Sequence, residues 1–316
     1  MTCLSGGSFF VRRKDGRQWY HASLSRDFRS VPMPETAFLP LVDVRWLAGH
    51  LHDPQVVVVD ASFFMPAQRR DAKTEFGAAH IPGARFFDID AIADTTCPLP
   101  HMLPAPAFFA EQVGRLGIGN DTHVIAYDGN DFMASARVWW TFRVFGHDRV
   151  SVLDGGLRCW RDQGLPLSSE EAARTECEFQ ARFRPELVSN LEDLRKAAAE
   201  RSIQILDARS PGRFAGTEPE PRPGLRSGHI PGSRNLFFQR LIDETSHCFK
   251  SVAALEALYR HAGIDLDRPV TTTCGTGVTA SILALGLYLL GRTDTAVYDG
   301  SWSEWGGRTD TPVETG

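Results

Sequence analysis

The feature that most constrains the fold is an internal repeat whose two copies are separated by 146 to 149 residues. A run of apolar, largely β-branched residues ends in Asp60 in the first copy and in Asp207 in the second. The turn sequence His-Ile-Pro-Gly begins at His80 and again at His229. A period of this length indicates a duplicated domain, because solenoid repeats are only about 20 to 50 residues long.

Within each copy, short β-branched runs alternate with segments of helical character. This alternation predicts an α/β fold in which each domain has a mainly parallel sheet flanked by helices. The predicted strands are residues 56–60, 124–127, 150–153, 203–207 and 270–273. The predicted helices are residues 42–51, 108–116, 133–145, 252–261 and 281–290, with a further helix around Trp160.

We divide the chain into a basic tail, a first domain, a polar linker and a second domain, at residues 1–36, 37–166, 167–186 and 187–316. The tail is rich in arginine but lacks the apolar core of a secretory signal. We interpret it as a poorly ordered tail or an overlong start, and an organellar presequence is the alternative.

Composition and charge restrict the partners of the chain. With 316 residues, 42% of them hydrophobic, and a formal net charge of −5, the chain is expected to form about two soluble domains without a nucleic-acid surface. No apolar run reaches the roughly 18 residues needed to span a bilayer. The six cysteines are scattered, without a metal-binding spacing, so we expect no metal site and a reducing compartment. The cytoplasm is the default, and the mitochondrion is the alternative if the tail is a presequence.

The most informative stretch of the second copy is a tight loop, Cys274-Gly-Thr-Gly-Val-Thr279, between a β-branched strand and an apolar helix. Gly275 and Gly277 let the backbone turn sharply and direct its N–H groups inward. Together with the helix N-terminus, these groups attract negative charge, which favours the thiolate of Cys274. Cys274 is therefore a candidate covalent nucleophile, and the alternative is an inert cysteine buried in a packing unit.

This loop resembles the active-site loop of the rhodanese superfamily, in which the cysteine carries a persulfide, and especially the form found in 3-mercaptopyruvate sulfurtransferases. Asp128 stands at the place of Cys274 in the first copy, so only the second copy can perform thiolate chemistry. Two-domain members of the family likewise have an inert first domain and a catalytic second one. The resemblance covers residues 40–310 and implies two tandem rhodanese-like domains with the active site facing the cleft between them.

The resemblance also implies roles for particular residues. Arg213 and Arg222 match the two arginines that bind the α-keto acid, although loop arginines can equally be solvated or bind neighbouring acidic groups. A proton-handling set of an Asp, a His and a Ser corresponds here to Asp90, His101 and Thr276, and threonine keeps the hydroxyl but restricts its rotamer. Asp90 and His101 could instead be a surface cap and a polar loop. The residues expected to bind the substrate are completed by the loop itself: Gly275, Gly277, Val278 and Thr279.

The implied reaction moves sulfur from 3-mercaptopyruvate, through a Cys274 persulfide, to a thiol, a thioredoxin or cyanide, and releases pyruvate without a metal or organic cofactor. Thiosulfate is the alternative donor, but thiosulfate sulfurtransferases usually place two basic residues where this chain has Gly275 and Thr276. Phosphatase chemistry in related folds needs an arginine six residues after the cysteine, where this chain has Ala280. A sulfur carrier or interaction module that does not turn over small donors also remains open.

Two other repeated features are interpreted as structural. His80 and His229 occur in both copies although only one copy has the thiol, so we expect each to bond its own turn. Trp302 and Trp305 are expected to pack between the two copies.

Overall fold

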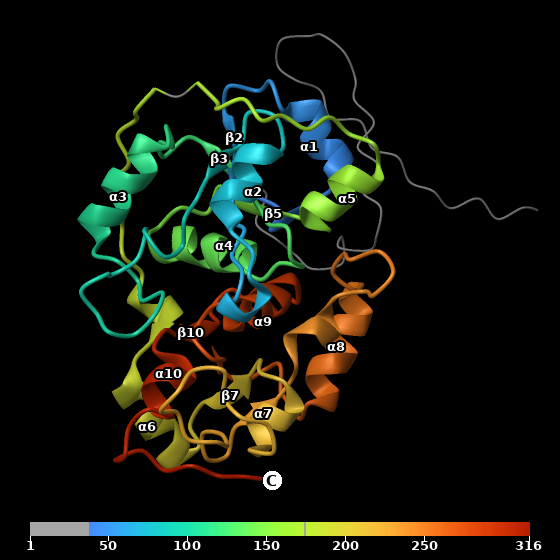
Figure 1. Cartoon of the computed structure of the whole chain (residues 1–316). Helices are drawn as coiled ribbons and strands as arrows, with labels where there is room; N and C mark the ends of the chain where they lie inside the picture. The colour runs from blue at the N-terminus through green and yellow to red at the C-terminus, as the bar shows by residue number, and fades with distance from the viewer. Residues whose placement is uncertain (1–37, 174) are drawn as a thin grey trace, which may run out of the picture.

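The computed structural model describes residues 38–173 and 175–316, which form two α/β units that pack against each other (Figure 1). Each unit contains a five-stranded sheet in which neighbouring strands are parallel. The predicted fold class, two tandem domains with mainly parallel sheets flanked by helices, is confirmed. The interpretation of the basic tail falls outside the described residues, and the boundaries assigned to the domains and the linker stay predictions.

The two sheets have the same strand order, so the repeat in the sequence is a repeat of topology. The first sheet runs, in spatial order, β1 (Leu41–Val42), β5 (Val150–Leu153), β4 (His123–Tyr127), β2 (Val56–Asp60) and β3 (Arg85–Phe86). The second sheet runs β6 (Val188–Ser189), β10 (Ala296–Tyr298), β9 (Val270–Thr273), β7 (Gln204–Asp207) and β8 (Arg234–Asn235).

The helices also correspond between the two units. Those of the first unit are α1 (Val44–His50), α2 (Ala72–Ala78), α3 (Pro106–Arg115), α4 (Ser135–Val144) and α5 (Gly156–Asp162). Those of the second are α6 (Leu191–Glu200), α7 (Pro211–Ala215), α8 (Val252–His261), α9 (Ala280–Leu289) and α10 (Ser301–Trp305). The described residues also form the short 3-10 helices η2 (Pro66–Gln68), η3 (Pro185–Leu187) and η4 (Phe238–Leu241). Within the described ranges, no helix is both long enough and apolar enough to cross a bilayer.

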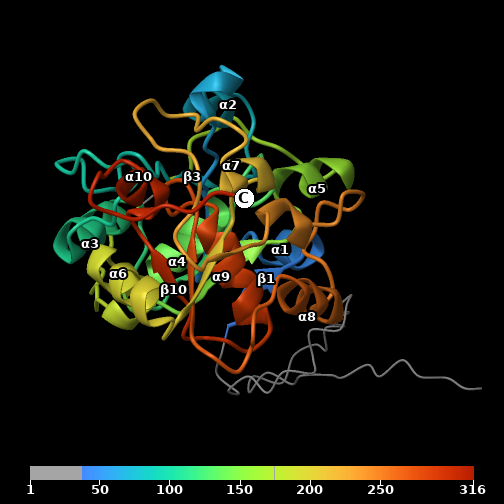
Figure 2. The same ribbon diagram turned by 90° about the horizontal axis from the view of Figure 1, so that it is seen from below.

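Each sheet is covered by helices on both faces, as expected for a parallel sheet. In the second unit, α6 and α10 lie on one face of the sheet and α8 and α9 lie on the other (Figure 2). Apolar side chains of each pair of helices belong to a separate core cluster. In the first unit, α1 and α5 cover one face, and α3 and α4 cover the other. The carboxyl ends of the central strands are thereby left to carry the loops that hold the polar side chains.

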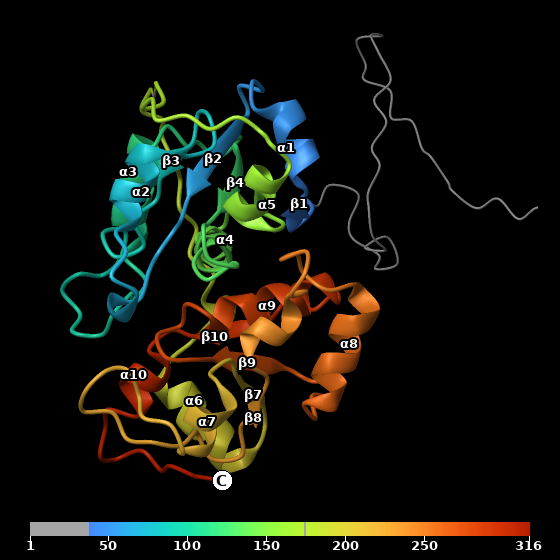
Figure 3. The same ribbon diagram turned by 45° about the vertical axis from the view of Figure 1, so that its right-hand side comes forward.

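The two units meet along α4 and α9, which lie against each other in the middle of the molecule (Figure 3). Every residue of α4 is buried, as are nearly all those of α9, because each helix packs on its own sheet and on the other helix. Trp139 and Tyr288 form an edge-to-face ring pair across this contact, with centroids 5.2 Å apart. Since α4 and α9 each follow the loop after a central strand, their packing brings both loops to the contact between the units.

The expectation for the two tryptophans is wrong. Trp302 and Trp305 are 1% and 0% exposed, but they pack within the second unit, in a cluster that contains Leu194 and Ile205. The cause is that α10 folds back over its own sheet directly after β10, so both indole rings cover that sheet.

Candidate active site

The backbone of Cys274 is held by the start of α10. Its amide donates to Oγ of Ser301 at 3.2 Å, and its carbonyl accepts from the amide of Trp302 at 2.9 Å. Ser301 has a left-handed backbone, with φ of 47°, which is unfavourable for a residue with a Cβ. Its hydroxyl also donates to the carbonyl of Tyr298 at 2.7 Å. The two hydrogen bonds of this hydroxyl, to Cys274 and to Tyr298, hold Ser301 in the unfavourable conformation. The Cys274 side chain is 1% exposed, which leaves the thiol almost fully covered.

The loop after Cys274 presents a set of backbone amides. Gly277 has φ of 76°, and a Cβ there would lie 2.9 Å from the carbonyl oxygen of Asp299 and 3.0 Å from Nη1 of Arg137, so only glycine fits. Among the described residues, none accepts a hydrogen bond from the amides of residues 275–280. Amides gathered at a helix N-terminus bind anions, so this loop can stabilise a negatively charged sulfur atom.

The corresponding loop of the first unit is filled by its own carboxylate. Asp128 is buried beyond β4, at the place that Cys274 takes beyond β9. Burial raises the pKa of this carboxyl, and hydrogen bonds from the loop oppose that shift. Its two oxygens accept from four backbone amides, those of Asn130 (3.1 Å), Phe132 (3.0 Å), Ala134 (3.2 Å) and Ser135 (2.8 Å). The loop of the first unit therefore has no thiol at this position, and its own carboxylate occupies four of its amides.

Arg213 reaches the Cys274 loop from α7. Its Nη2 lies 3.1 Å from the position that a Cβ on Gly275 would take. The same nitrogen donates to Oε2 of Glu220 at 2.5 Å, and Nε lies 3.3 Å from Oε1. Arg213 thus both binds an acidic neighbour and lies beside the loop, and its remaining N–H groups can bind a substrate anion.

Glu220 is fixed in turn by Arg209, whose Nη1 donates to its Oε1 at 2.7 Å. Arg209 also pairs with Asp207 at 2.7 Å, and its guanidinium lies 4.2 Å from the ring centroid of Trp302. The side chains of Arg209, Asp207 and Glu220 are at most 2% exposed, so they form a rigid support for Arg213. Glu220 could not be singled out from the sequence, because acidic residues are common in such loops.

Arg222 is the half-buried cation of the site, and no described residue makes a hydrogen bond or ion pair with it. Burial lowers the pKa of its guanidinium, and the neighbouring Arg213 lowers it further. Interactions with Cys274, Asp90 and Glu220 act in the opposite direction, which puts Arg222 within electrostatic range of both the thiol and the first unit. A half-buried arginine without an anionic partner is suited to bind a carboxylate.

Asp90 and His101 lie together, as predicted. Nδ1 of His101 is 2.8 Å from Oδ1 of Asp90, although the ring is not well aligned for a hydrogen bond to that oxygen. The imidazole is 3% exposed, whereas the carboxylate is 61% exposed. The His101 side chain lowers the pKa of Asp90, and burial partly opposes this effect. Nε2 of His101 makes no hydrogen bond with any described residue, so it can exchange a proton with a bound molecule.

A buried ion pair that the sequence did not reveal links the backbone of His101 to the second unit. Nη2 of Arg137 donates to Oδ1 of Asp299 and to the carbonyl of His101, at 2.6 Å in each case. The amide of Leu103 donates to the other Asp299 oxygen at 2.8 Å. Arg137 stood out only as a charge within the apolar segment 133–145, which is the signal that could have identified it.

The loop and the segment of His101 thus come together around Gly277, which lies beside Arg137. Thr276 lies in this loop and is buried, but no hydrogen bond joins its hydroxyl to His101 in the described part of the chain. Thr276 and His101, two members of the predicted proton path, therefore belong to segments that meet at Gly277 but share no hydrogen bond.

The repeated histidines are structural, although their partners differ from the prediction. Nδ1 of His80 lies 2.7 Å from the carbonyl oxygen of Phe76, and that of His229 lies 2.8 Å from the carbonyl oxygen of Phe214. Each imidazole also stacks on the ring of the same phenylalanine. The acceptor thus belongs to the preceding helix rather than to the turn itself. No group of three or more potential metal ligands occurs in the residues that the structure covers.

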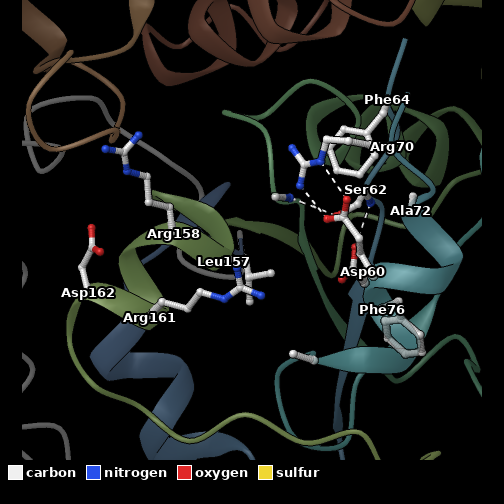
Figure 4. Close-up of a pocket in the computed structure, with 13 residues that line it drawn as sticks. Asp60, Ser62, Phe64, Arg70, Ala72, Phe76, Leu157, Arg158, Arg161 and Asp162 are labelled. Atoms are coloured by element: carbon white, nitrogen blue, oxygen red, sulfur yellow. Dashed lines mark hydrogen bonds and ion pairs between the residues drawn. The ribbon is translucent and has the colours of Figure 1, made fainter. Parts of the chain in front are cut away.

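A cavity of about 250 Å³ lies in the first unit rather than at Cys274 (Figure 4). Gly129, the counterpart of Gly275, lines it together with Asp60 and Ser62. Arg70 and Arg161 extend into the same region from opposite sides in Figure 4. The cavity therefore lies beside the loop of Asp128, where no thiol is present to react with a molecule bound there.

The chain matches the family model of the rhodanese-like domain twice, over residues 43–163 and 190–308. It is 46% identical to the human 3-mercaptopyruvate sulfurtransferase over 271 residues, which cover 84% of this chain and 91% of that protein. It is 43% identical over 297 residues to the mitochondrial thiosulfate/3-mercaptopyruvate sulfurtransferase 1 of Arabidopsis thaliana, with 87% of this chain and 78% of that protein covered.

The crystal structure of SseA from Escherichia coli, described as a 3-mercaptopyruvate sulfotransferase, superimposes with a TM-score of 0.77 at 39% identity. The superposition covers 84% of this chain and 99% of that one. The resemblance stated from the sequence is thereby confirmed. The chain belongs to the rhodanese family, as a two-domain sulfurtransferase.

Proposed function

We propose that the protein transfers sulfur from 3-mercaptopyruvate to a thiophilic acceptor through a persulfide on Cys274. The observation that carries this proposal is the contrast between the loops: no described residue accepts from the amides of residues 275–280, whereas four amides of the corresponding first-unit loop donate to Asp128. The name of the human relative supports 3-mercaptopyruvate as the donor.

In the first half-reaction, the Cys274 thiolate attacks the sulfur of the donor. The new S–S bond forms as the carbon–sulfur bond breaks, and the electron pair of that bond leaves as the enolate of pyruvate. The loop amides stabilise the negative charge on the outer sulfur of the persulfide. Arg222 and the free N–H groups of Arg213 hold the carboxylate and keto oxygen of the donor, which fixes its sulfur next to Cys274.

The proton balance requires that the donor thiol loses a proton and that the enolate carbon gains one. His101 is suited to this exchange because its Nε2 is buried and makes no hydrogen bond with a described residue. Asp90 lies 2.8 Å from Nδ1 and holds the ring in this position. Thr276 completes the path if its hydroxyl bonds the donor, which would link the loop to His101.

In the second half-reaction, a thiol, a thioredoxin or cyanide attacks the outer sulfur, and the Cys274 thiolate leaves. Neither half-reaction involves a metal or an organic cofactor. We assign the reaction to the cytoplasm, where thiol acceptors are kept reduced, and the mitochondrion is the alternative. Fractionation of cells that express the full chain tests this assignment.

Thiosulfate is the second candidate donor, because the name of the Arabidopsis relative includes both donors. Two features argue against it as the preferred donor. Gly275 and Thr276 provide no cation at the positions after the cysteine. A basic side chain at position 275 would also meet Nη2 of Arg213, which lies 3.1 Å from the Cβ position.

The test is the ratio of kcat/KM for 3-mercaptopyruvate to that for thiosulfate, measured with the same acceptor. We expect a ratio well above one, and replacing Gly275 with Arg and Thr276 with Lys should lower it. A natural protein that prefers thiosulfate would overturn the choice of donor. A persulfide that forms without turnover of either donor would instead support a sulfur carrier.

A further inference from the structure

The two units make a second polar contact that mirrors the one at the active site. The segment before α8 crosses to the first unit, where the amide of Phe249 donates to Oδ1 of Asp154 at 2.8 Å (Figures 1 and 3). Asp154 follows β5 as Asp299 follows β10. Nδ1 of His247 lies 3.1 Å from Oδ1 of Asp131, in the first-unit loop. His247 is thus the counterpart of His101, and this contact is the counterpart of the active site.

Two thiols meet at this second contact, one from each unit. Cys159 lies on α5 and Cys248 lies in the crossing segment. Both sulfur atoms approach the carbonyl oxygen of Ser246, Cys159 at 3.1 Å and Cys248 at 3.4 Å. A Cβ placed on Gly155 would touch both sulfur atoms, so the two thiols share one small space.

The environment of Cys159 favours its thiolate, the reactive form of the thiol. A hydrogen bond from Cys248 lowers the pKa of Cys159, and the charge of Arg158 acts in the same direction. Burial and the nearby Asp154 and Asp162 oppose this shift. Both cysteines are partly exposed, whereas Cys274 is buried, so a reagent in solution can reach the pair.

We propose that Cys159 and Cys248 are a redox modification site, at which a low-molecular-weight disulfide converts them into a reversible disulfide between the two units. The Cys159 thiolate attacks the reagent, forms a mixed disulfide and releases one thiolate. The Cys248 thiolate then attacks the Cys159 sulfur of that mixed disulfide and releases the second thiolate. Two protein thiols are oxidised, one reagent disulfide is reduced to two thiols, and no other oxidant is needed.

The bond would tie the two units together at the contact opposite the active site. A cross-link between distant parts of a chain restricts the unfolded state, so the oxidised protein should unfold at a temperature several degrees higher than the reduced protein. Because Cys274 takes no part, the disulfide should form equally well in a Cys274→Ser variant.

The test treats the reduced full-length protein with glutathione disulfide, blocks remaining thiols with N-ethylmaleimide, and maps the peptides by mass spectrometry without reduction. We expect one peptide pair that joins Cys159 to Cys248, formed in both the natural protein and Cys274→Ser, and lost after dithiothreitol. The matched control is Cys177→Ser, which removes an exposed cysteine elsewhere and should leave the cross-link unchanged.

Two variants keep the test decisive. Cys159→Ser and Cys248→Ser should each abolish both the cross-linked peptide and the rise in melting temperature. The proposal is overturned if both thiols are alkylated after treatment, or if each carries glutathione and no joined peptide forms. It is also overturned if the joined peptide forms without any rise in melting temperature, because the pair would then not link the folded units.

Discussion

The Asp128 loop and the Cys274 loop take the same place relative to the two sheets, but they differ in what binds their backbone amides. Both follow a central strand, both lead into a buried helix, and both first residues accept a backbone amide through their carbonyl. In the first unit the carboxylate of Asp128 binds four amides of its own loop. In the second unit the shorter Cys274 thiol leaves the amides to a sulfur anion. The side chain at this one position, Asp128 or Cys274, thus determines whether the loop amides are occupied by the protein itself or are available to a bound anion.

The difference extends to the neighbouring strand. Asp207 at the end of β7 is paired with Arg209, which supports Glu220 and through it Arg213. Asp60 at the end of β2 has Ser62 in place of that arginine, and burial raises the pKa of the Asp60 carboxyl. The second unit therefore adds an arginine framework beside the Cys274 loop, which in our proposal positions the substrate anion, and Ser62 replaces its central arginine in the first unit.

The largest effect is expected for Cys274→Ser, which should reduce sulfur transfer from every donor to background. The serine hydroxyl is a poor nucleophile and forms no persulfide, and Asp128 offers no substitute. The measurement is turnover with 3-mercaptopyruvate and with thiosulfate, alongside circular dichroism to verify the fold. Cys177→Ser is the control and should keep full activity. Substantial transfer by Cys274→Ser would show that another thiol is the nucleophile.

Replacing Asp128 with alanine should mainly reduce stability, whereas replacing Cys274 with alanine should mainly reduce catalysis. Asp128→Ala leaves four buried amides without an acceptor, so it should lower the free energy of unfolding by about 3 kcal/mol. Cys274→Ala should cost only about 1 kcal/mol, because it removes one buried sulfur atom. Denaturant unfolding of both variants measures the contrast. Equal costs would mean that the amides of the first loop do not depend on Asp128.

Arg222→Ala should reduce kcat/KM for 3-mercaptopyruvate. The decrease should correspond to a loss of about 2–3 kcal/mol of transition-state stabilisation, the value of a charged hydrogen bond. Arg213→Ala should do the same, but it also removes a partner of the buried Glu220 and should cost stability as well. The matched control is Arg161→Ala at the cavity of the first unit, which should leave kcat/KM unchanged. Unchanged kinetics for Arg222→Ala would assign that arginine to solvent rather than to the donor.

The smallest effect is expected for Asp90→Asn, with a roughly tenfold decrease in kcat/KM, because Asp90 acts on the donor only through His101. The lowered pKa of Asp90 also has a consequence for stability. A carboxyl with a lowered pKa in the folded state stabilises the fold above its unfolded pKa of about 3.9, and this contribution disappears as the pH falls through the folded pKa. Since the carboxylate is largely exposed, the stability effect should be small. Urea unfolding at pH 7 and pH 3 should show a smaller difference between Asp90→Asn and the natural protein at pH 3.

The sequence was sufficient for the long central elements but not for the edges. β9 and α8 have the predicted bounds. A β-branched run is a clear signal for a strand, and apolar residues at helical spacing over ten residues are a clear signal for a helix. The two-residue strands β1, β3, β6 and β8 are too short to show any periodicity, and they form only because a neighbouring strand pairs with them. The short helices α2, α7 and α10 were missed because so few residues show no helical period, and the ten-residue helix α6 was not predicted either.

The candidate site shows the same limit. Cys274 could be identified from its own loop, because the glycines and the following helix determine the local field. The pairing of Arg137 with Asp299 joins segments far apart in the chain. The support of Arg213 by Glu220 is local in sequence, but it depends on how the loop between α7 and β8 folds. The first contact arises from the packing of the two units and the second from the fold of an irregular loop, and neither has a periodic pattern in the sequence.

The most direct test of the account is the mass of the protein after exposure to 3-mercaptopyruvate in the absence of an acceptor. We expect that the intact protein gains one sulfur atom, that peptide mapping places it on Cys274, and that cyanide removes it. The Cys274→Ser variant should gain none. A sulfur atom found on Cys159, Cys248 or another cysteine, or turnover without any sulfur bound to Cys274, would contradict the account.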